Sequence, residues 1–470
     1  MVAPTRRGGP PVPAIFQEIL KGEGTRARAL RSAGFILIGF GGQNILRLAS
    51  NLILTRLLFP EAFGLMSLVM VFLTGLALFS DLGVNVSIMQ HKRGEDRDFL
   101  NTAWTMQIIR GVIIWLVCCL IAWPAALIYN EPRLAELLPV AGLTSVITGF
   151  TTTRVAVMNR NLQIGVQVMT GLGTQALGIL FTVVLTWFWR DVWALVFGSM
   201  LSFLTQNYLL NRLLPGERNK LCWDRDAVHS MLHFGKYIFL SSIAGFLSNQ
   251  GDRAVLGGYV SMADLGIYTV GFTMAQLSLQ LIRAAGSKVL LPLNRQFMQL
   301  DVPENRAKVF RARRMLLAGG MVGVFLMTVF GVPLIHFLYD SRYDQAGPIL
   351  VLMGIPITLQ IASSLYDGVY LAHGDSKTNF YLNGWRALCQ TILLFVGVSQ
   401  FGILGAIAAQ ALGTLLVYPL QAIMTRRYHG WDPLADALVV LTGGAAVVIA
   451  FVLFQDDMSA FLSWSLAATK

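Results

Sequence analysis

The sequence predicts an all-α polytopic membrane protein, with about 12–14 transmembrane helices in two six-helix pseudo-repeat lobes around a central cavity. Three observations lead to this fold class. Charged residues make up 13% of the 470 residues and hydrophobic residues 55%, whereas a soluble domain carries about 25% charged residues. Long apolar runs recur along the chain, and part of the first half aligns with the second at an offset of 202 residues. A soluble enzyme, a secreted disulfide scaffold and a disordered chain are excluded.

Thirteen apolar segments are long enough to cross about 30 Å of hydrocarbon as helices. They are residues 34–55, 64–88, 103–128, 136–158, 168–188, 193–214, 234–257, 265–291, 315–338, 348–372, 380–400, 403–424 and 435–454. The stretch before the first segment has no early apolar core, so we expect no cleavable signal peptide. The tail 458–470 is too short for a fourteenth span.

These spans predict a division of the chain into two lobes and three smaller parts. The parts are a cytoplasmic N-terminal segment (1–33), an N-lobe of spans 1–6 (34–214), a cytoplasmic inter-lobe loop (215–233), a C-lobe of spans 7–12 (234–424), and residues 425–470 with the additional span 435–454 and a tail. Residues 64–92 align without gaps with residues 266–294, which matches Gly64 with Gly266. Transporters are often built from such repeats, with the binding site between them.

Lysine and arginine are unequally distributed between the two sets of loops. The loops and flanking residues on the side of the N-terminus carry 24 of them, and the opposite loops carry four: Arg56, Arg133, Arg190 and Arg342. Cytoplasmic loops collect Lys and Arg, so we expect the N-terminus in the cytoplasm. The same rule accounts for the net charge of +11 without a nucleic-acid partner. The four cysteines lack metal-binding spacing, and we expect neither a metal site nor a cofactor.

Polar residues recur at intervals of three, four and seven within several spans, which places each set on one helix face. Such a face turns away from lipid, because a charge at mid-bilayer costs at least roughly 2.5–3.5 kcal/mol. The candidate substrate-binding residues are Asn44, Arg47 and Asn51 in the first span, Asp81 and Asn85 in the second, Asp252 and Arg253 in the seventh, Gln280 and Arg283 in the eighth, Asp367 in the tenth and Arg386 in the eleventh.

Cations outnumber anions within the predicted spans. Seven Lys and Arg residues, among them Arg47 and Arg283, face three Asp residues. A cavity with surplus guanidinium suits an anionic, phosphate-bearing ligand. Arg154 lies near a span end, and we expect its guanidinium to extend to the lipid headgroups. Asp81 and Asp367 either neutralise a neighbouring arginine, which we favour, or carry a coupling ion, H⁺ or Na⁺.

Sequence motifs for catalysis are missing. There is no nucleophile elbow, zinc signature or ATP-binding loop, so we expect no enzymatic activity. The alternative from a different class is a membrane glycosyltransferase or polymerase. Such an enzyme would need acidic residues in a substantial outer loop, whereas the acidic residues here are scattered over short connections.

Four segments resemble the polysaccharide-transporter branch of the multidrug/oligosaccharidyl-lipid/polysaccharide flippase superfamily. They are TRLLFPEAFGLMSLV (55–69), SDLGVNVSIMQHK (80–92), DLGIYTVGF (264–272) and KVLLPLNRQF (288–297). The sequence is most similar to Wzx-type exporters of exopolysaccharide repeat units, of the colanic-acid kind, over most of residues 30–430. The most specific part of the resemblance is the pattern of Arg56, Leu57, Pro60, Phe63 and Gly64.

The resemblance implies two lobes facing each other in a V, with a central cavity lined by spans 1, 2, 7 and 8. It implies a location in the bacterial inner membrane and alternating-access export of undecaprenyl-diphosphate-linked oligosaccharides for exopolysaccharide or lipopolysaccharide biosynthesis. Membrane lipids, a polysaccharide polymerase and glycosyltransferases are the partners expected around it. The alternative within the superfamily is a cation-coupled multidrug exporter, which the surplus of arginine disfavours.

Overall fold

A computed structural model describes residues 25–81, 83–161 and 165–467, and these residues form helices joined by short connections. The first half contains α2 (Thr25–Leu57), α3 (Pro60–Phe79), α4 (Val84–Gln90), α5 (Arg97–Tyr129), α6 (Arg133–Gly149), α7 (Arg154–Arg160), α8 (Gly165–Trp189) and α9 (Val192–Leu213). The second half contains α10 (Arg225–Tyr259), α11 (Met262–Gln296), α12 (Pro303–Val329), α13 (Gly331–Leu338), the 3₁₀ turn η1 (Ser341–Tyr343), α14 (Ala346–Leu352), α15 (Gly354–Ser364), α16 (Asp367–Ala372), α17 (Ser376–Arg426), α18 (Pro433–Leu453) and α19 (Gln455–Ala467).

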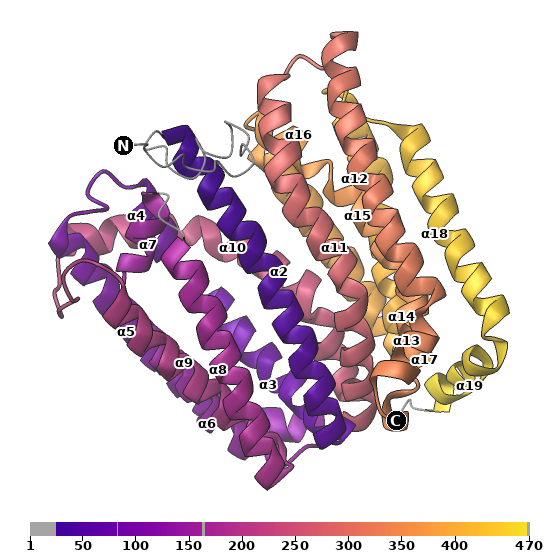
Figure 1. Cartoon of the computed structure of the whole chain (residues 1–470), viewed down its shortest axis with the longest axis horizontal. Coiled ribbons are helices and arrows are strands. Elements are labelled where there is room, and N and C mark those ends of the chain that lie inside the picture. The colour runs from indigo at the N-terminus through magenta and orange to yellow at the C-terminus, as the bar shows by residue number, and fades with distance from the viewer. Residues whose placement is uncertain (1–24, 82, 162–164, 468–470) are drawn as a thin grey trace, which may run out of the picture.

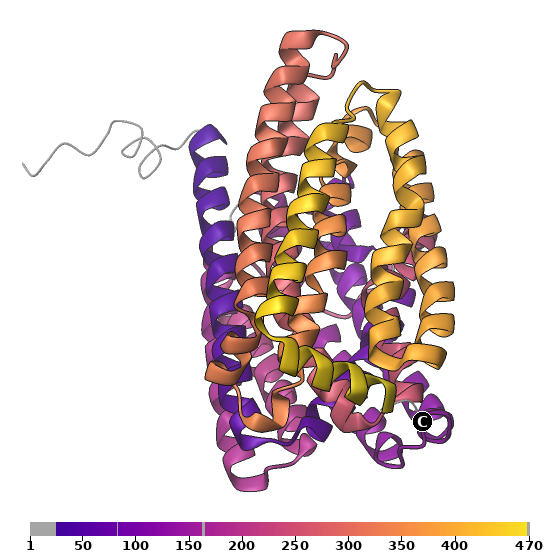
Figure 2. The ribbon, with the colours of Figure 1, turned by 90° about the vertical axis from the view of Figure 1, so that its right-hand side faces the viewer.

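The described helices are those of a multi-pass membrane protein. Seven of them are by themselves long and apolar enough to cross a membrane, and two bent helix pairs raise the number to nine. The more polar α2, α9 and α10 have 33, 22 and 35 residues, enough for a crossing by length. α17 is interrupted at Gly402, whose φ of 54° and ψ of −128° are not helical, and so makes two passes (Figure 2). Each of the thirteen predicted segments therefore has a helical counterpart.

Four predicted spans are each divided between two or more helices: 64–88, 136–158, 315–338 and 348–372. The prediction of one helix over residues 64–88 is wrong, because α3 ends at Phe79 and α4 begins at Val84. In this break Gly83 has a φ of 62°, and Asp81 Oδ1 accepts a hydrogen bond from the Gly83 N–H at 2.9 Å. An Asp side chain that bonds to nearby backbone competes with the helix, and glycine tolerates the left-handed conformation. α6 and α7 meet at 58°, and the helices flanking Met353 meet at 43°.

The helices form two lobes that meet at one end of the molecule. We call the end at which α2 begins the N-terminal end and the opposite end the distal end. Figure 1 shows α2–α9 and α11–α18 converging at the distal end and diverging toward the N-terminal end. α10 connects the lobes: it begins within the predicted loop 215–233, and its first turns place Ala227 and Met231 in a cluster with Ile88 and Phe99 of the N-lobe.

The lobes contact each other through α3 and α11 without intervening side chains. A Cβ atom added to Gly64 would lie 1.9 Å from the carbonyl oxygen of Met262, and one added to Gly266 would lie 1.9 Å from that of Pro60. These contacts are equivalent under the 202-residue repeat. A pseudo-two-fold axis therefore passes between α3 and α11.

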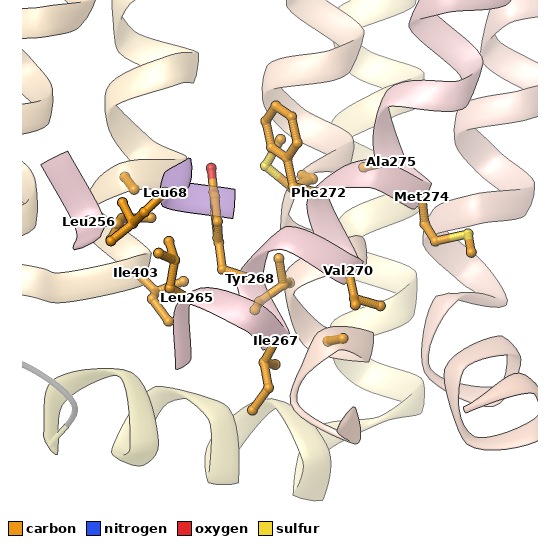
Figure 3. Packing of buried hydrophobic residues seen from close by; sticks show 14 of the residues in the cluster. Leu68, Leu256, Leu265, Ile267, Tyr268, Val270, Phe272, Met274, Ala275 and Ile403 are labelled. Atoms are coloured by element: carbon orange, nitrogen blue, oxygen red, sulfur yellow. The ribbon is translucent and has the colours of Figure 1, made fainter. Parts of the chain in front are cut away.

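We call the contact between α3 and α11 the seam. Hydrogen bonding and apolar packing extend it. Thr269 Oγ1 donates to Ser67 Oγ at 3.2 Å, and these residues are also 202 positions apart. Figure 3 shows Leu265 of α11 beside Leu68 and Leu256, whereas Val270 points to the other side of α11. Since α11 is buried on both sides, it lies at the centre of the apolar core and is the element that positions the charged residues described next.

Candidate functional site

Arg47 connects α2 to α11 across the lobes. Its Nη2 donates to Asn44 Oδ1 at 2.7 Å, one turn earlier on α2, and to Gln280 Oε1 on α11 at 3.1 Å. The structure thus brings together three residues that the sequence analysis selected. Arg47 is half-buried and forms no ion pair with a described residue. No described carboxylate therefore compensates the positive charge of this guanidinium, which lies between the lobes.

A second cationic cluster lies in the C-lobe, one turn along α11. Arg283 and Asp367 line the same pocket of about 270 Å³. Arg386 of α17 interacts electrostatically with both, and its Nη2 donates to Ser363 Oγ at 2.5 Å. Arg283 is exposed and Arg386 is buried. Two guanidinium groups thus share one carboxylate, which leaves this cluster with a net charge of about +1.

Asp81 lies apart from both clusters, in the N-lobe. It occupies the break between α3 and α4, and its Oδ1 is 3.8 Å from Nη1 of Arg110. Arg110 also donates to Ser80 Oγ at 3.0 Å and to the carbonyl oxygen of Ala77. The nearest cation to Asp81 is therefore an arginine of its own lobe rather than Arg47 or Arg283.

Asp252 is buried in the C-lobe and faces neutral donors. Its side chain accepts a hydrogen bond from the Tyr268 hydroxyl at 2.7 Å and one from Gln410 Nε2 at 3.4 Å. Tyr268 and Gln410 also bond to each other at 3.0 Å. The adjacent Arg253 points elsewhere, with its guanidinium 4.7 Å from the centre of the Phe272 ring. Asp252 therefore belongs to a closed polar network and not to the arginine clusters.

The two remaining candidate residues are not joined to a cluster. Asn51 is half-buried on α2, and Asn85 is exposed on the short helix α4. Neither side chain forms a hydrogen bond with a described residue. The break between α3 and α4 explains the position of Asn85, because the regular helical spacing that predicted one common face for Asp81 and Asn85 ends at this break.

The expectation that Arg154 extends to the lipid headgroups is wrong. Arg154 is 8% exposed, and its guanidinium donates to the carbonyl oxygens of Asn211, Leu214 and Gly216 at 2.6–3.2 Å. The last carbonyl groups of a helix lack intrahelical partners. Arg154 satisfies those at the end of α9 and is therefore a structural residue.

The sequence analysis missed a buried ion pair by treating residues 292–314 as a charged loop. Arg313 is 2% exposed, and its Nη2 donates to Asp436 Oδ1 at 2.5 Å. The hydroxyls of Tyr366 and Tyr418 donate to the other oxygen of Asp436 at 2.5 and 2.6 Å. The available signal was the position of Asp436 at the start of the span 435–454. This network ties α18 to α12 and lies outside the arginine clusters.

The distal end of the seam is closed by Arg342, which lies in η1 of the C-lobe and faces the N-lobe. Its Nη2 donates to the carbonyl oxygens of Thr55 and Arg56, both at 3.4 Å. Its guanidinium lies 4.7 Å from the centre of the Phe59 ring. Hydrogen bonds from the backbone and side chain of Arg342 hold the pKa of Asp340 below its ordinary value. A ligand held between the lobes therefore has no path through this contact unless the lobes move.

Comparison with known protein families identifies one family. The model of the family described as "Polysaccharide biosynthesis protein" matches residues 53–348. The succinoglycan biosynthesis transport protein ExoT of Rhizobium meliloti is 22% identical, over 77% of this chain and 72% of its own length. The lipopolysaccharide biosynthesis protein WzxC of Escherichia coli is 21% identical, over 84% of this chain and 78% of its own.

Solved structures share the arrangement of the two lobes. The lipid II flippase MurJ in an inward closed conformation matches with a TM-score of 0.70 at 13% identity, over 90% of this chain and 99% of its own. An inward-facing multidrug transporter of the MATE family matches with a TM-score of 0.61 at 13% identity, over 82% and 95%. At such low identity these similarities show a common fold.

Proposed function

The chain belongs to the polysaccharide biosynthesis protein family, and from this premise we propose that it is a flippase for undecaprenyl-diphosphate-linked oligosaccharide repeat units. The transport serves exopolysaccharide or lipopolysaccharide biosynthesis at the bacterial inner membrane. Two relatives named for polysaccharide biosynthesis, which cover most of this chain, support the assignment. The lobes alternate access to the two sides of the membrane, as expected for a protein built from two repeats.

The observation that carries the proposal is the unpaired guanidinium charge along α2 and α11. Arg47 has no carboxylate partner among the described residues, and Arg283 shares Asp367 with Arg386. A diphosphate supplies the missing negative charge, and guanidinium binds phosphate oxygens with two parallel hydrogen bonds. The same charge disfavours cationic drugs as substrates.

Different side chains bind the different chemical parts of the substrate. Arg47 and Arg283 hold the diphosphate, while Asn44 and Gln280 offer amide groups to the sugar hydroxyls after Arg47 turns to the ligand. The polyprenyl chain stays in the lipid, because exposing its apolar surface to the water of the cavity is unfavourable. Separation of α3 from α11 then opens the distal end. No covalent step is required, and we propose a transporter without enzymatic activity.

Substitution of the two arginines tests this proposal. Arg47→Ala and Arg283→Ala should each lower glycan export at least roughly tenfold, since a hydrogen bond to a charged group contributes about 1.5–3 kcal/mol. The amount of protein in the membrane should stay unchanged. Arg56→Ala is the control, because this exposed side chain lies in the last turn of α2 at the distal end. Normal export by both variants would show that these arginines do not bind the substrate.

We also propose that the N-terminal end faces the cytoplasm, because that side carries the excess of Lys and Arg. Single cysteines at Arg218 and Asp340, in a chain without its four native cysteines, test the orientation. A membrane-impermeant thiol reagent added to intact spheroplasts should label position 340 and leave position 218 unlabelled. The reverse pattern would overturn both the orientation and the direction of transport.

Polysaccharide polymerase and glycosyltransferases are the partners that we propose, because they consume and supply the translocated unit. The alternative of a membrane glycosyltransferase or polymerase is testable with the same material. The purified chain should release no elongated glycan when supplied with lipid-linked acceptor and activated sugar, and elongation would contradict a purely transporting role.

A further inference from the structure

Two adjoining cavities lie on the N-lobe, near the N-terminal end. The polar cleft is formed by residues 95–101, 153–161 and 215–219, and its volume is about 320 Å³. The apolar groove is formed by residues 165–177 and 209–215 together with Met158, and its volume is about 890 Å³. Met158 and Pro215 line both cavities. A single molecule with a polar and an apolar part can therefore occupy the two together.

The polar cleft carries surplus positive charge. Its two glutamates are paired, Glu217 with Arg97 at 2.6 Å and Glu95 with Arg160 at 3.7 Å. Arg154 and Arg218 also line the cleft, and neither forms an ion pair with a described carboxylate. The cleft therefore presents two guanidinium charges that no acidic side chain in the described part of the chain compensates.

The two uncompensated arginines differ in what they offer to a ligand. All N–H groups of Arg154 are used on neutral oxygens of Thr152, Asn211, Leu214 and Gly216, so that it contributes a buried charge without free donors. Arg218 is exposed, and no described residue accepts a hydrogen bond from its side chain. Its charge is close enough to repel that of Arg154. An anion beside Arg218 relieves this repulsion and gains charge-assisted hydrogen bonds.

The apolar groove suits a hydrocarbon chain. Thr170 is its one polar side chain, and Val166, Met169 and Leu213 are exposed toward the region that lipid occupies in a membrane. Gly173 leaves the middle of the groove open, because a Cβ atom added there meets nothing within 4 Å. The groove belongs mainly to α8 and α9, and neither Arg47 nor Arg283 lines it.

We propose that the polar cleft and the apolar groove together form a binding site for an anionic phospholipid of the adjacent leaflet. The phosphate lies against Arg218 in the field of Arg154, and one acyl chain fills the groove. Basic pockets between transmembrane helices recognise anionic headgroups in this way. The site is independent of the export substrate, which we place between the lobes.

The experiment is a lipid titration of the purified full-length chain, followed by native mass spectrometry. Wild-type protein should bind dioleoyl phosphatidylglycerol more tightly than dioleoyl phosphatidylcholine, which carries no net charge. Arg218→Gln should weaken phosphatidylglycerol binding about fivefold, the contribution of one basic residue near an anionic surface. Gly173→Leu should weaken it roughly tenfold, because the new side chain displaces about two methylene groups of the lipid.

Matched controls separate this site from general effects of charge and size. Arg212→Gln removes an exposed arginine of α9 that lines neither cavity, and Gly319→Leu enlarges an exposed glycine of α12 that also has open space around it. Both controls should bind like wild type. Equal binding of the two lipids, or unchanged binding in both site variants, would overturn the proposal. The midpoint of thermal unfolding is also measured with inorganic phosphate and with phosphatidylglycerol. If the two raise it equally, the cleft binds a free anion rather than a phospholipid, and the proposal is overturned.

Discussion

Charged side chains within the helices of this protein fall into two groups that differ in their partners. Arg154 and Arg313 are buried and donate to carbonyl oxygens or to a carboxylate, although Nε and Nη1 of Arg313 have no partner among the described residues. Arg47 has no described carboxylate partner, Arg283 shares Asp367 with Arg386, and both lie on the helices that face the other lobe. Burial of an ionised group is costly unless it is paired. The first group therefore stabilises the fold, and the second is available to a ligand.

Substitution of Asp81 tests whether this intramembrane carboxylate pairs with Arg110 or carries a coupling ion. The hydrogen bond to Gly83 and the 3.8 Å separation from Arg110 favour pairing. Asp81→Asn keeps the acceptor for Gly83 and loses only a half-exposed ion pair, so glycan translocation should stay within about tenfold of wild type. The measurement is translocation of lipid-linked glycan in vesicles, with and without an imposed pH gradient. Pairing is refuted if wild-type transport responds to the gradient and the Asn variant does not.

At the scale of elements, α18 is held to the C-lobe by polar contacts as well as apolar packing. Asp436 in its first turn accepts bonds from Arg313, Tyr366 and Tyr418. The preceding Asp432 accepts two bonds from Arg314, at 2.7 and 3.0 Å. Without Asp436 of α18, the buried guanidinium of Arg313 on α12 would lack a carboxylate partner. The additional span after the two six-helix lobes is thus part of the folded C-lobe.

Removal of one partner from the buried pair should destabilise the protein. Asp436→Asn leaves Arg313 without a carboxylate and should lower the free energy of unfolding by about 3–5 kcal/mol. Thermal unfolding in detergent measures the change. Glu304→Gln, which removes an exposed carboxylate 2.8 Å from Lys308 on the same helix, should leave the midpoint unchanged. Equal unfolding midpoints for the two variants would mean that the ion pair of Arg313 and Asp436 contributes no stability.

At the scale of the molecule, the contact between lobes lies on the axis that relates them. Gly64 and Gly266 allow the backbones of α3 and α11 to touch, because even a Cβ atom at either position would clash with the other helix. Because the contact is symmetric and no side chains interlock at these two glycines, the lobes can separate there without unfolding either one. Polar contacts of Arg342 and the Ser67–Thr269 hydrogen bond hold it closed. This arrangement fits a transporter whose distal end opens in one state and closes in the other.

A methyl group at this axis should favour the state in which the distal end is open. Gly64→Ala or Gly266→Ala places Cβ at 1.9 Å from a carbonyl oxygen, whereas C···O contacts lie near 3.3 Å. Spin labels at Glu61 and Ser341, which are exposed in opposite lobes at the distal end, should report longer distances by several ångströms. Gly258→Ala, which meets nothing within 4 Å on α10, is the control. Unchanged distance distributions would show that the seam is not a gate.

The helical membrane class, the thirteen segments and the 202-residue relation between Gly64 and Gly266 all followed from composition and periodicity. These are local properties: hydrocarbon thickness sets the length of a span, and the 3.6-residue period sets which residues share a face. The same spacing selected Arg47 and Gln280 as candidates on their separate helices. It also failed at Asn85, because a break in the helix cancels the period beyond it.

Contacts between distant segments were decided by tertiary structure. Arg47 meets Gln280 across 233 residues, Asp252 turns into a closed network with Gln410, and Arg313 enters the bundle to reach Asp436. The tilt and rotation of each helix determine such pairs, and these depend on how the helices pack against one another. A helical period predicts that a charged face avoids lipid. Packing alone decides whether that face meets the other lobe, a partner in its own lobe, or the end of a neighbouring helix.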